Sequence, residues 1–316
     1  MKPNVLVLGP KMPGIIDLVS EFANPVAHWD HGDLDACQAA AGGPFRGVLA
    51  TGESRVTRAF QAELPELEII GCFGVGYDGI DVEAALERGI AVTNTPGVLT
   101  EDVADLAVGL MITVRRNMVQ ADRYIRDGRW EREGPMPLAG RVQGKKVGLV
   151  GLGRIGLAIA RRLEAFNCTI AYHKRTRLTD SAYPYVENLV ELASASDILV
   201  VSTPGGRTTE GMIDRSVLRA LGPEGTLVNI ARGSVVDEQA LIETLKSGEL
   251  GSAALDVFRD EPRVPDALKR LPNVVLTPHI GSATSETRHA MRDLVLENLR
   301  NHFDGKPLVT PVPEMG

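Results

Sequence analysis

The stretch KKVGLVGLGRIGLAIARRLEAF, residues 145 to 166, contains an apolar run, a group of glycines and a helical pattern, in that order. The apolar run predicts a buried strand and the last part predicts a helix, so Gly151, Gly153 and Gly156 fall on the turn between them. The first glycine allows a tight turn, the second a close approach to a pyrophosphate, and the third close packing of helix on strand. A plain glycine-rich turn is the alternative. The strand–turn–helix order favours a dinucleotide site with the phosphates at the helix amino terminus.

The next expected strand, TIAY, ends in a cluster of positive charge. An NAD site normally has an Asp or Glu here that binds the ribose 2′-hydroxyl, but His173, 22 positions after Gly151 (173 − 151), begins the run HKRTR. Guanidinium groups bind a 2′-phosphate well, so Arg175 and Arg177 favour NADPH, with NADH as the weaker alternative. A solvated basic loop is the other interpretation. The residues expected around this phosphate are His173, Lys174, Arg175, Thr176 and Arg177.

Composition narrows the class of protein. The chain has 316 residues, 44% hydrophobic and 24% charged, which is ordinary for a globular protein and enough for two domains. Its formal net charge of -7 predicts no affinity for nucleic acid or for an anionic membrane. We expect no membrane-spanning segment. Cys37, Cys72 and Cys168 form no Cys-x-x-Cys pair, which favours free thiols and a cytoplasmic location. The segment His28–His31 lacks a third ligand, so no metal site is expected.

Short β-rich runs alternate with helical patterns, which predicts an α/β fold with parallel sheets flanked by helices. The expected strands are residues 4–9, 47–51, 68–73, 91–95, 169–172, 198–204, 225–231, 252–257 and 274–278, together with the strand that precedes the glycine turn. Residues 100–128 predict one long helix that begins at Thr100. The segment 128–144, which contains Pro and Gly, predicts a loop or an arm.

Three expected strand ends carry side chains that could take part in catalysis. Arg232 lies in NIARGSVVDE, Glu261 in ALDVFRDEP and His279 in TPHIGSAT. Singly, each has a structural interpretation: a helix start, a turn before proline, and a core histidine. All three in this order, downstream of a dinucleotide turn, indicate a catalytic group.

The chain resembles the D-isomer-specific 2-hydroxyacid dehydrogenase family from end to end, in its NADPH-dependent hydroxypyruvate and hydroxyphenylpyruvate reductase branch. The motifs are TPGVLTEDVADLAVGL, GKKVGLVGLGRIG, VNIARGSVVDE, LDVFRDEP and LTPHIGSATSETR. The resemblance implies NADPH-dependent reduction of hydroxypyruvate, glyoxylate or a related 2-keto acid to the D-2-hydroxy acid. It also implies two Rossmann-like domains, one flavodoxin-like and one dinucleotide-binding, with a cleft between them. We expect the substrate domain at residues 1–98 and 287–316, and the cofactor domain at residues 99–286.

The chemistry of such a reduction gives the three residues their expected roles. His279 would protonate the keto oxygen while Arg232 binds the carboxylate and polarises the carbonyl. Glu261 would orient the imidazole and favour its protonated form. The resemblance implies that Asp256 binds the nicotinamide carboxamide. Further cofactor contacts are expected at Arg154, Ile155, Thr203, Ile230, Ala231 and Gly281. On the substrate side, the expected residues are Thr51, Gly52, Val75 and Gly76, besides Arg232 and His279.

Two expectations concern assembly. The long helix from Asp102 is expected to form a homodimer interface, and Trp130 or Met136 could then reach the active site of a partner subunit. Two other functions also fit the motifs. One is a dehydrogenase of the same scaffold that oxidises phosphite, or less readily formate, whose enzymes are expected to have Gln at the position of Glu261. The other is a non-enzymatic, dinucleotide-sensing protein like the corepressors that keep the same three residues.

Overall fold

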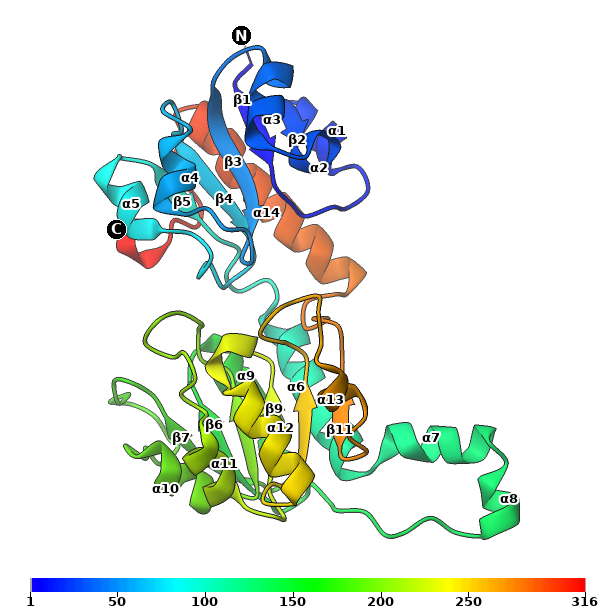
Figure 1. The fold of residues 1–316 in the computed structure, drawn as a ribbon. Coiled ribbons are helices and arrows are strands. Elements are labelled where there is room, and N and C mark those ends of the chain that lie inside the picture. The colour runs from blue at the N-terminus through cyan, green and yellow to red at the C-terminus, as the bar shows by residue number, and fades with distance from the viewer. Residues whose placement is uncertain (1, 316) are drawn as a thin grey trace. The chain divides into compact units, whose positions relative to one another are not determined.

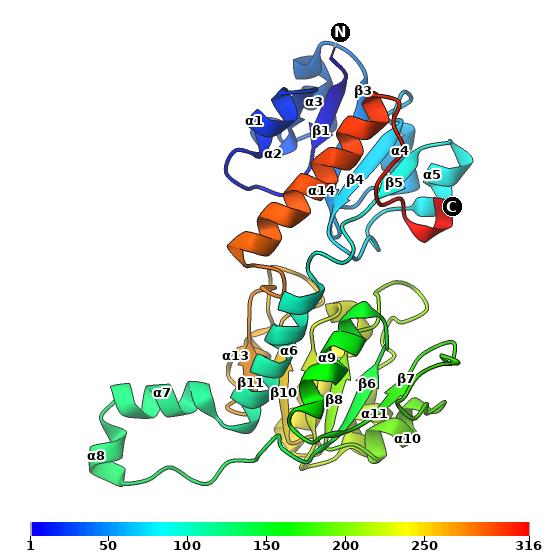
Figure 2. The same cartoon turned by 180° about the vertical axis from the view of Figure 1, so that it is seen from behind.

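The computed structural model describes residues 2–315, which form two compact units (Figures 1 and 2). Unit 1 contains the described residues up to Leu99 and those from Thr284 onward, and unit 2 is Thr100–Ala283. The expected domain limits are 98/99 and 286/287, whereas the observed division places Leu99 and residues 284–286 with unit 1. Each unit has its own parallel sheet, which confirms the α/β class.

Unit 1 is built on a five-stranded sheet in the order β2-β1-β3-β4-β5. This is the flavodoxin-like order, as expected. All neighbouring strands are parallel. The strands are β1 (Asn4–Val7), β2 (Asn24–Ala27), β3 (Phe45–Thr51), β4 (Ile69–Phe73) and β5 (Ala91–Thr93). The helices are α1 (Ile15–Ser20), α2 (His28–His31), α3 (Leu34–Ala41), α4 (Arg58–Ala62), α5 (Val82–Glu87) and α14 (Ser285–Phe303), followed by the 3-10 turn η2 (Pro313–Met315).

Helix α14 packs closely on β4, in front of the sheet in Figure 2. A Cβ atom at Gly71 of β4 would lie only 3.1 Å from Val295 Cγ2, so the glycine permits this approach. A separate apolar cluster joins the sheet to α3, where Cys37 is fully buried. The sheet is therefore covered by helices and buried, as parallel sheets require.

Strand β2 was not predicted from the sequence. It contains Pro25, which argues against a central strand because proline cannot donate to the ladder. The structure places β2 at the edge of the sheet, next to β1 only, where a proline is tolerated.

Unit 2 is built on a six-stranded parallel sheet in the order β11-β10-β9-β8-β6-β7. The strands are β6 (Lys146–Val150), β7 (Thr169–His173), β8 (Ile198–Val201), β9 (Thr226–Asn229), β10 (Ser252–Leu255) and β11 (Val274–Leu276). Strand β6 pairs with β7 on one side and β8 on the other, so the strand order reverses there. The carboxyl end of such a switch point is where doubly wound sheets bind ligands.

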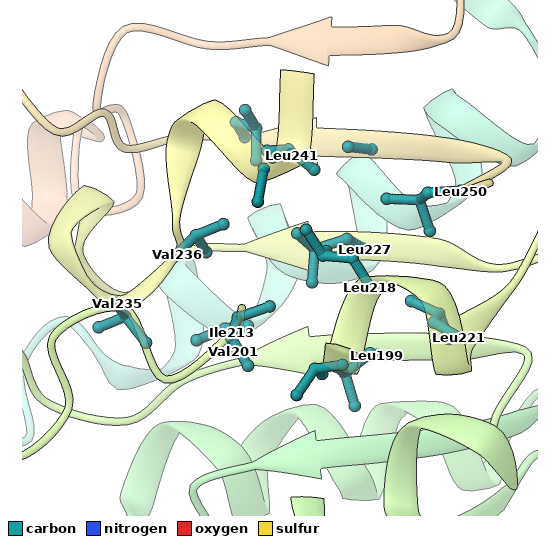
Figure 3. Packing of buried hydrophobic residues seen from close by; sticks show 14 of the residues in the cluster. Leu199, Val201, Ile213, Leu218, Leu221, Leu227, Val235, Val236, Leu241 and Leu250 are labelled. Carbon is teal, nitrogen blue, oxygen red and sulfur yellow. The ribbon is translucent and has the colours of Figure 1, made fainter. Parts of the chain in front are cut away.

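Helices cover both faces of this sheet. They are α6 (Thr100–Arg115), α9 (Arg154–Glu164), α10 (Leu189–Ser194), α11 (Arg215–Leu221), α12 (Glu238–Ser247) and α13 (Asp266–Lys269), with the 3-10 turn η1 (Gly233–Val235). Figure 3 shows one core layer, in which Leu218 of α11 and Leu241 of α12 pack on strand residues such as Leu227. On the other face α6 packs against α9. Among residues 2–315, no helix is long and apolar enough to cross a membrane.

The single long helix expected over residues 100–128 is wrong, because the structure contains two helices there, α6 and α7 (Met118–Arg126). A third helix, α8 (Arg129–Glu133), follows in the segment expected to be a loop or an arm. Asn117 has a φ of 50° and Gly128 a φ of 64°, and both are left-handed values that end a helix. Figures 1 and 2 show α7 and α8 extending away from the sheet of unit 2 as an arm. Part of the expected loop is therefore helical.

Candidate active site

The glycine turn joins β6 to α9 at the switch point of unit 2. Gly151 has a φ of 99°, and a Cβ there would lie 2.8 Å from the amide nitrogen of Thr203. A Cβ at Gly156 would lie 2.4 Å from the carbonyl oxygen of Gly151. Both glycines are thus required by the protein's own packing. A Cβ at Gly153, in contrast, would have no atom within 4 Å, so the chain leaves room beside this residue. This pattern fits the predicted task of each glycine.

Helix α9 begins directly after Gly153, which provides no side chain to cap it. Arg154 and Ile155 are its first residues, and Arg154 is exposed. Uncapped amides at a helix amino terminus favour an anion. On the other side of the turn, the hydroxyl of Ser202 donates to the carbonyl of Gly151 at 2.9 Å. Thr203 therefore lies beside the turn.

The cationic run follows the end of β7, the strand next to β6. His173 is the last residue of β7 and its carbonyl accepts a hydrogen bond of 2.8 Å from the amide of Gly151. Lys174 is half-buried, and Arg175 and Arg177 are exposed, as is Thr176 between them. Within residues 2–315, no carboxylate forms an ion pair with Lys174, Arg175 or Arg177. The charge here is not neutralised by the protein.

The three candidate catalytic residues follow three neighbouring strands. Arg232 comes after β9, Glu261 after β10 and His279 after β11. The Nδ1 atom of His279 lies 2.7 Å from Oε2 of Glu261. The other carboxylate oxygen of Glu261 accepts a hydrogen bond of 2.8 Å from the amide of Phe258, and this bond fixes the orientation of the carboxylate. The Glu261 side chain is 18% exposed and that of His279 is 34% exposed, so the pair is partly shielded from water.

The loop of Arg232 is fixed by the side chain of Asn229. The amide of Ala231 donates to Asn229 Oδ1 at 3.0 Å, and Asn229 Nδ2 donates to the carbonyl of Arg232 at 3.0 Å. Ile230 is buried and its amide donates to the carbonyl of Val201. The half-buried Arg232 is therefore held on a firm turn at the end of β9.

Asp256 organises the loop that carries His279. Its buried carboxylate accepts hydrogen bonds from the hydroxyl of Thr277 at 2.6 Å and from the amides of Ile280 and Gly281, both at 2.8 Å. Burial raises the pKa of the Asp256 carboxyl, and these hydrogen bonds oppose that rise. His279 has a φ of 51°, a conformation that costs about 1–3 kcal/mol in a residue other than glycine. The carboxylate helps to hold this backbone, a role that the sequence alone did not indicate.

In unit 1, the expected substrate loops follow β3 and β4. Thr51 ends β3, and its amide donates to the hydroxyl of Ser54 at 3.0 Å, while the carbonyl of Gly52 accepts from Gly79. After β4, the carbonyl of Val75 accepts a hydrogen bond of 2.9 Å from Asn94 Nδ2.

Within residues 2–315, no group accepts a hydrogen bond from the amides of Val75 and Gly76. Two adjacent amides without acceptors fit the expected carboxylate site.

Arg288 was missed by the sequence reasoning. It lies in the first turn of α14, and its guanidinium stands over the ring of Phe73 at 5.5 Å. Burial lowers the pKa of Arg288, with Glu53 opposing the shift. A cation in the first turn of a helix opposes the helix dipole, and this mismatch was the available sequence signal.

The fold and the site together define a class. A glycine turn at the switch point of a doubly wound sheet, with a histidine–carboxylate pair and an arginine on the following strands, is typical of a nicotinamide-dependent dehydrogenase. Residues 108–281 match the family model described as "D-isomer specific 2-hydroxyacid dehydrogenase, NAD binding domain". The chain belongs to the D-isomer-specific 2-hydroxyacid dehydrogenase family.

Similar proteins extend this assignment. The chain is 52% identical over 268 residues to a glyoxylate/hydroxypyruvate reductase of Arabidopsis thaliana, covering 85% of both chains. It is 40% identical to a 2-ketogluconate reductase of Gluconobacter oxydans, covering 98% of this chain and 99% of that protein. Among solved structures, an NADPH-dependent glyoxylate/hydroxypyruvate reductase from Sinorhizobium meliloti, in complex with NADP and malonate, has a TM-score of 0.92 and 45% identity. The match covers 99% of this chain and 98% of that one.

Proposed function

We propose that this protein is an oxidoreductase that reduces a small 2-keto acid, of the hydroxypyruvate or glyoxylate type, to the D-2-hydroxy acid with NADPH. The observation that carries the proposal is the His279–Glu261 pair at 2.7 Å, which follows strands β10 and β11 in the same sheet as the glycine turn. The reductases of Arabidopsis thaliana and Sinorhizobium meliloti support it.

The residues of unit 2 fit a phosphorylated dinucleotide. The room beside Gly153 and the uncapped start of α9 suit a pyrophosphate, and Arg175 and Arg177 suit a 2′-phosphate because no carboxylate of the described chain neutralises them. When bound, the nicotinamide supplies the hydride that reduces the keto carbon. Its proposed contacts are Gly151, Gly153, Arg154, Ile155, Gly156, His173, Lys174, Arg175, Thr176, Arg177, Thr203, Ile230, Ala231, Asp256 and Gly281.

The protein's own groups provide the proton and hold the substrate. Because Nδ1 of His279 is engaged with Glu261, the proton for the keto oxygen is carried on Nε2. Arg232 binds the substrate carboxylate and stabilises the charge that develops on the carbonyl oxygen. Glu261, held by the amide of Phe258, fixes the imidazole plane.

On the unit 1 side we propose that the amides of Val75 and Gly76 bind the substrate carboxylate, with Thr51 and Gly52 lining the same site. The support is that neither amide of the 75–76 pair has an acceptor in the described chain. Asn94 holds the carbonyl of Val75, which directs the peptide groups of this loop.

We also propose a cytoplasmic homodimer that associates through α6 and the arm. The arm exposes several large apolar side chains, an arrangement typical of a protein interface. They are Met118, Val119, Ile125 and Trp130, and the exposed Leu138 follows in the loop after α8. In this assembly Trp130 or Met136 would complete the active site of the partner subunit. All three cysteines are free thiols, as in proteins of a reducing compartment.

The test is an initial-rate assay of NADPH and NADH oxidation with hydroxypyruvate, glyoxylate, pyruvate, 2-ketogluconate and hydroxyphenylpyruvate. We expect turnover with NADPH, and we expect Arg175→Ala to reduce the preference for NADPH over NADH by about 10- to 100-fold, the value of one charge-assisted hydrogen bond.

Arg161→Ala removes an exposed cation from α9 and should leave the preference unchanged. If no keto acid is reduced, the proposal is wrong and a dinucleotide-sensing protein becomes the better interpretation.

A further inference from the structure

We infer that the hydroxyl of Tyr172 is a positioning group for the cationic loop, and that it contributes to cofactor choice through Arg175 and Arg177 without touching the cofactor. The inference rests on the proposed function, because it concerns the same NADPH site. Tyr172 is fully buried in β7, directly before the loop.

The hydroxyl closes the loop at its far end. The amide of Leu178 donates a hydrogen bond of 3.0 Å to the Tyr172 hydroxyl oxygen. The chain thus leaves the sheet after His173 and is tied back to the preceding strand residue at Leu178. Every residue of the run from Lys174 to Arg177 lies within this closed turn. A turn with both ends fixed samples fewer conformations, so its cations lose less entropy when they bind a phosphate.

The near end of the loop is fixed by residues 184–186, a segment that lies beside β7. Nδ1 of His173 lies 3.2 Å from the carbonyl oxygen of Val186, to which the Nδ1–H tautomer donates. The amide of Val186 donates to the carbonyl of Tyr172 at 2.8 Å, and the amide of Tyr172 donates to the carbonyl of Pro184 at 2.9 Å. This segment covers the free edge of β7 and holds the backbone of Tyr172 in place, which fixes the position of the Tyr172 hydroxyl.

The aromatic ring of Tyr172 is anchored separately from the hydroxyl. Its centroid lies 5.5 Å from that of Tyr185, and the residue pairs in register with Leu149 of β6. Replacing the tyrosine by phenylalanine therefore keeps the packing and removes one hydrogen-bond acceptor. Leu178 is only half-buried and its hydrogen bond to Tyr172 is partly buried, so we expect water to replace the lost partner and the fold to be retained.

The experiment compares Tyr172→Phe with Tyr183→Phe in the full-length protein, measuring dissociation constants for NADPH and NADH by cofactor fluorescence. Tyr183 is the matched control, because its hydroxyl bonds to Glu164 at 2.7 Å, away from the cationic run. We expect Tyr172→Phe to weaken NADPH binding by about two- to tenfold, the value of one hydrogen bond, with NADH binding changed less than twofold. Tyr183→Phe should change neither.

A double-mutant cycle separates this inference from the proposed function. In an Arg175→Ala background, Tyr172→Phe should have little further effect, because the hydroxyl acts through the cations. If Arg175→Ala lowers the NADPH preference and Tyr172→Phe does not, or weakens both cofactors equally, the inference is wrong while the proposed function stands. If Arg175→Ala itself leaves the preference unchanged, the phosphate site is elsewhere and both proposals about this loop fail.

Discussion

At the scale of single residues, we propose that the chemistry depends on His279 and Glu261, which lie 2.7 Å apart. We expect His279→Gln to lower kcat for keto-acid reduction by about 10²- to 10⁴-fold, because a positioned general acid contributes that much. Glu261→Gln keeps a hydrogen-bonding side chain but removes the charge, and its effect should be smaller. Steady-state kinetics of both single variants and the double variant test this.

Because we propose that the two residues act as a unit, the double variant should be little worse than His279→Gln alone. Independent, additive losses would show that Glu261 does not act through the imidazole. NADPH binding should stay unchanged in all three variants, and it serves as the control for folding.

The sequence indicates those candidate site residues that are defined by a strand end and a residue type. Arg232, Glu261 and His279 were identified because each follows an apolar run and because their order is distinctive. The roles of Asp256 in the His279 loop and of Arg288 over Phe73 were not, since both depend on burial and on contacts between distant segments. A sequence pattern indicates the position of a charged residue in the chain, but not which groups of the folded protein contact its charged atoms.

At the scale of elements, the starts of β6 and β8 are joined by Asp197. Its Oδ1 lies 3.0 Å from Lys145 Nζ and its Oδ2 accepts from the amide of Lys146 at 2.8 Å. Burial alone would raise the pKa of this carboxyl, but the bonds from Lys146 and Lys145 outweigh it and lower the pKa. We expect Asp197→Asn to lower the free energy of unfolding by about 1–2 kcal/mol at neutral pH.

The sign of the pH dependence follows from the lowered pKa. The stabilising contribution is fully present above the pKa of the unfolded carboxyl, whose ordinary value is 3.8, and is lost as the pH falls through the folded pKa. Urea unfolding of the wild type and Asp197→Asn at neutral pH and below the ordinary carboxyl range measures this. A difference that stays constant across that range would show that the ionised carboxylate is not the stabilising form.

The elements themselves were largely predictable, since all ten expected strands are short apolar runs that the structure places in the two sheets. The errors have local causes. Strand β2 was not predicted because it contains Pro25. A proline is compatible only with an edge strand, and the sequence does not show which strand lies at the edge. The helix from Thr100 breaks at Asn117, where a left-handed backbone interrupts an apolar pattern that continues beyond it.

At the scale of the whole molecule, the proposed homodimer can be tested through the arm. Ile125 is 55% exposed on α7, and Ile125→Glu would place a charge in the proposed interface. We expect this variant to halve the mass measured by light scattering after size-exclusion chromatography.

Leu86→Glu is the matched control, because Leu86 is also an exposed apolar residue, at 44%, but lies on α5 of unit 1. It should leave the mass unchanged. A wild-type protein that is monomeric at all concentrations would exclude the dimer directly.

The strand order of unit 2 has an evolutionary consequence. The loop that we assign to cofactor choice follows β7 at one edge of the sheet, while the residues assigned to proton transfer follow β10 and β11 at the opposite edge. The two sets share no hydrogen bond within residues 2–315. Natural selection can therefore exchange one nicotinamide cofactor for the other by altering a few codons after β7, in a lineage whose reaction chemistry is inherited intact.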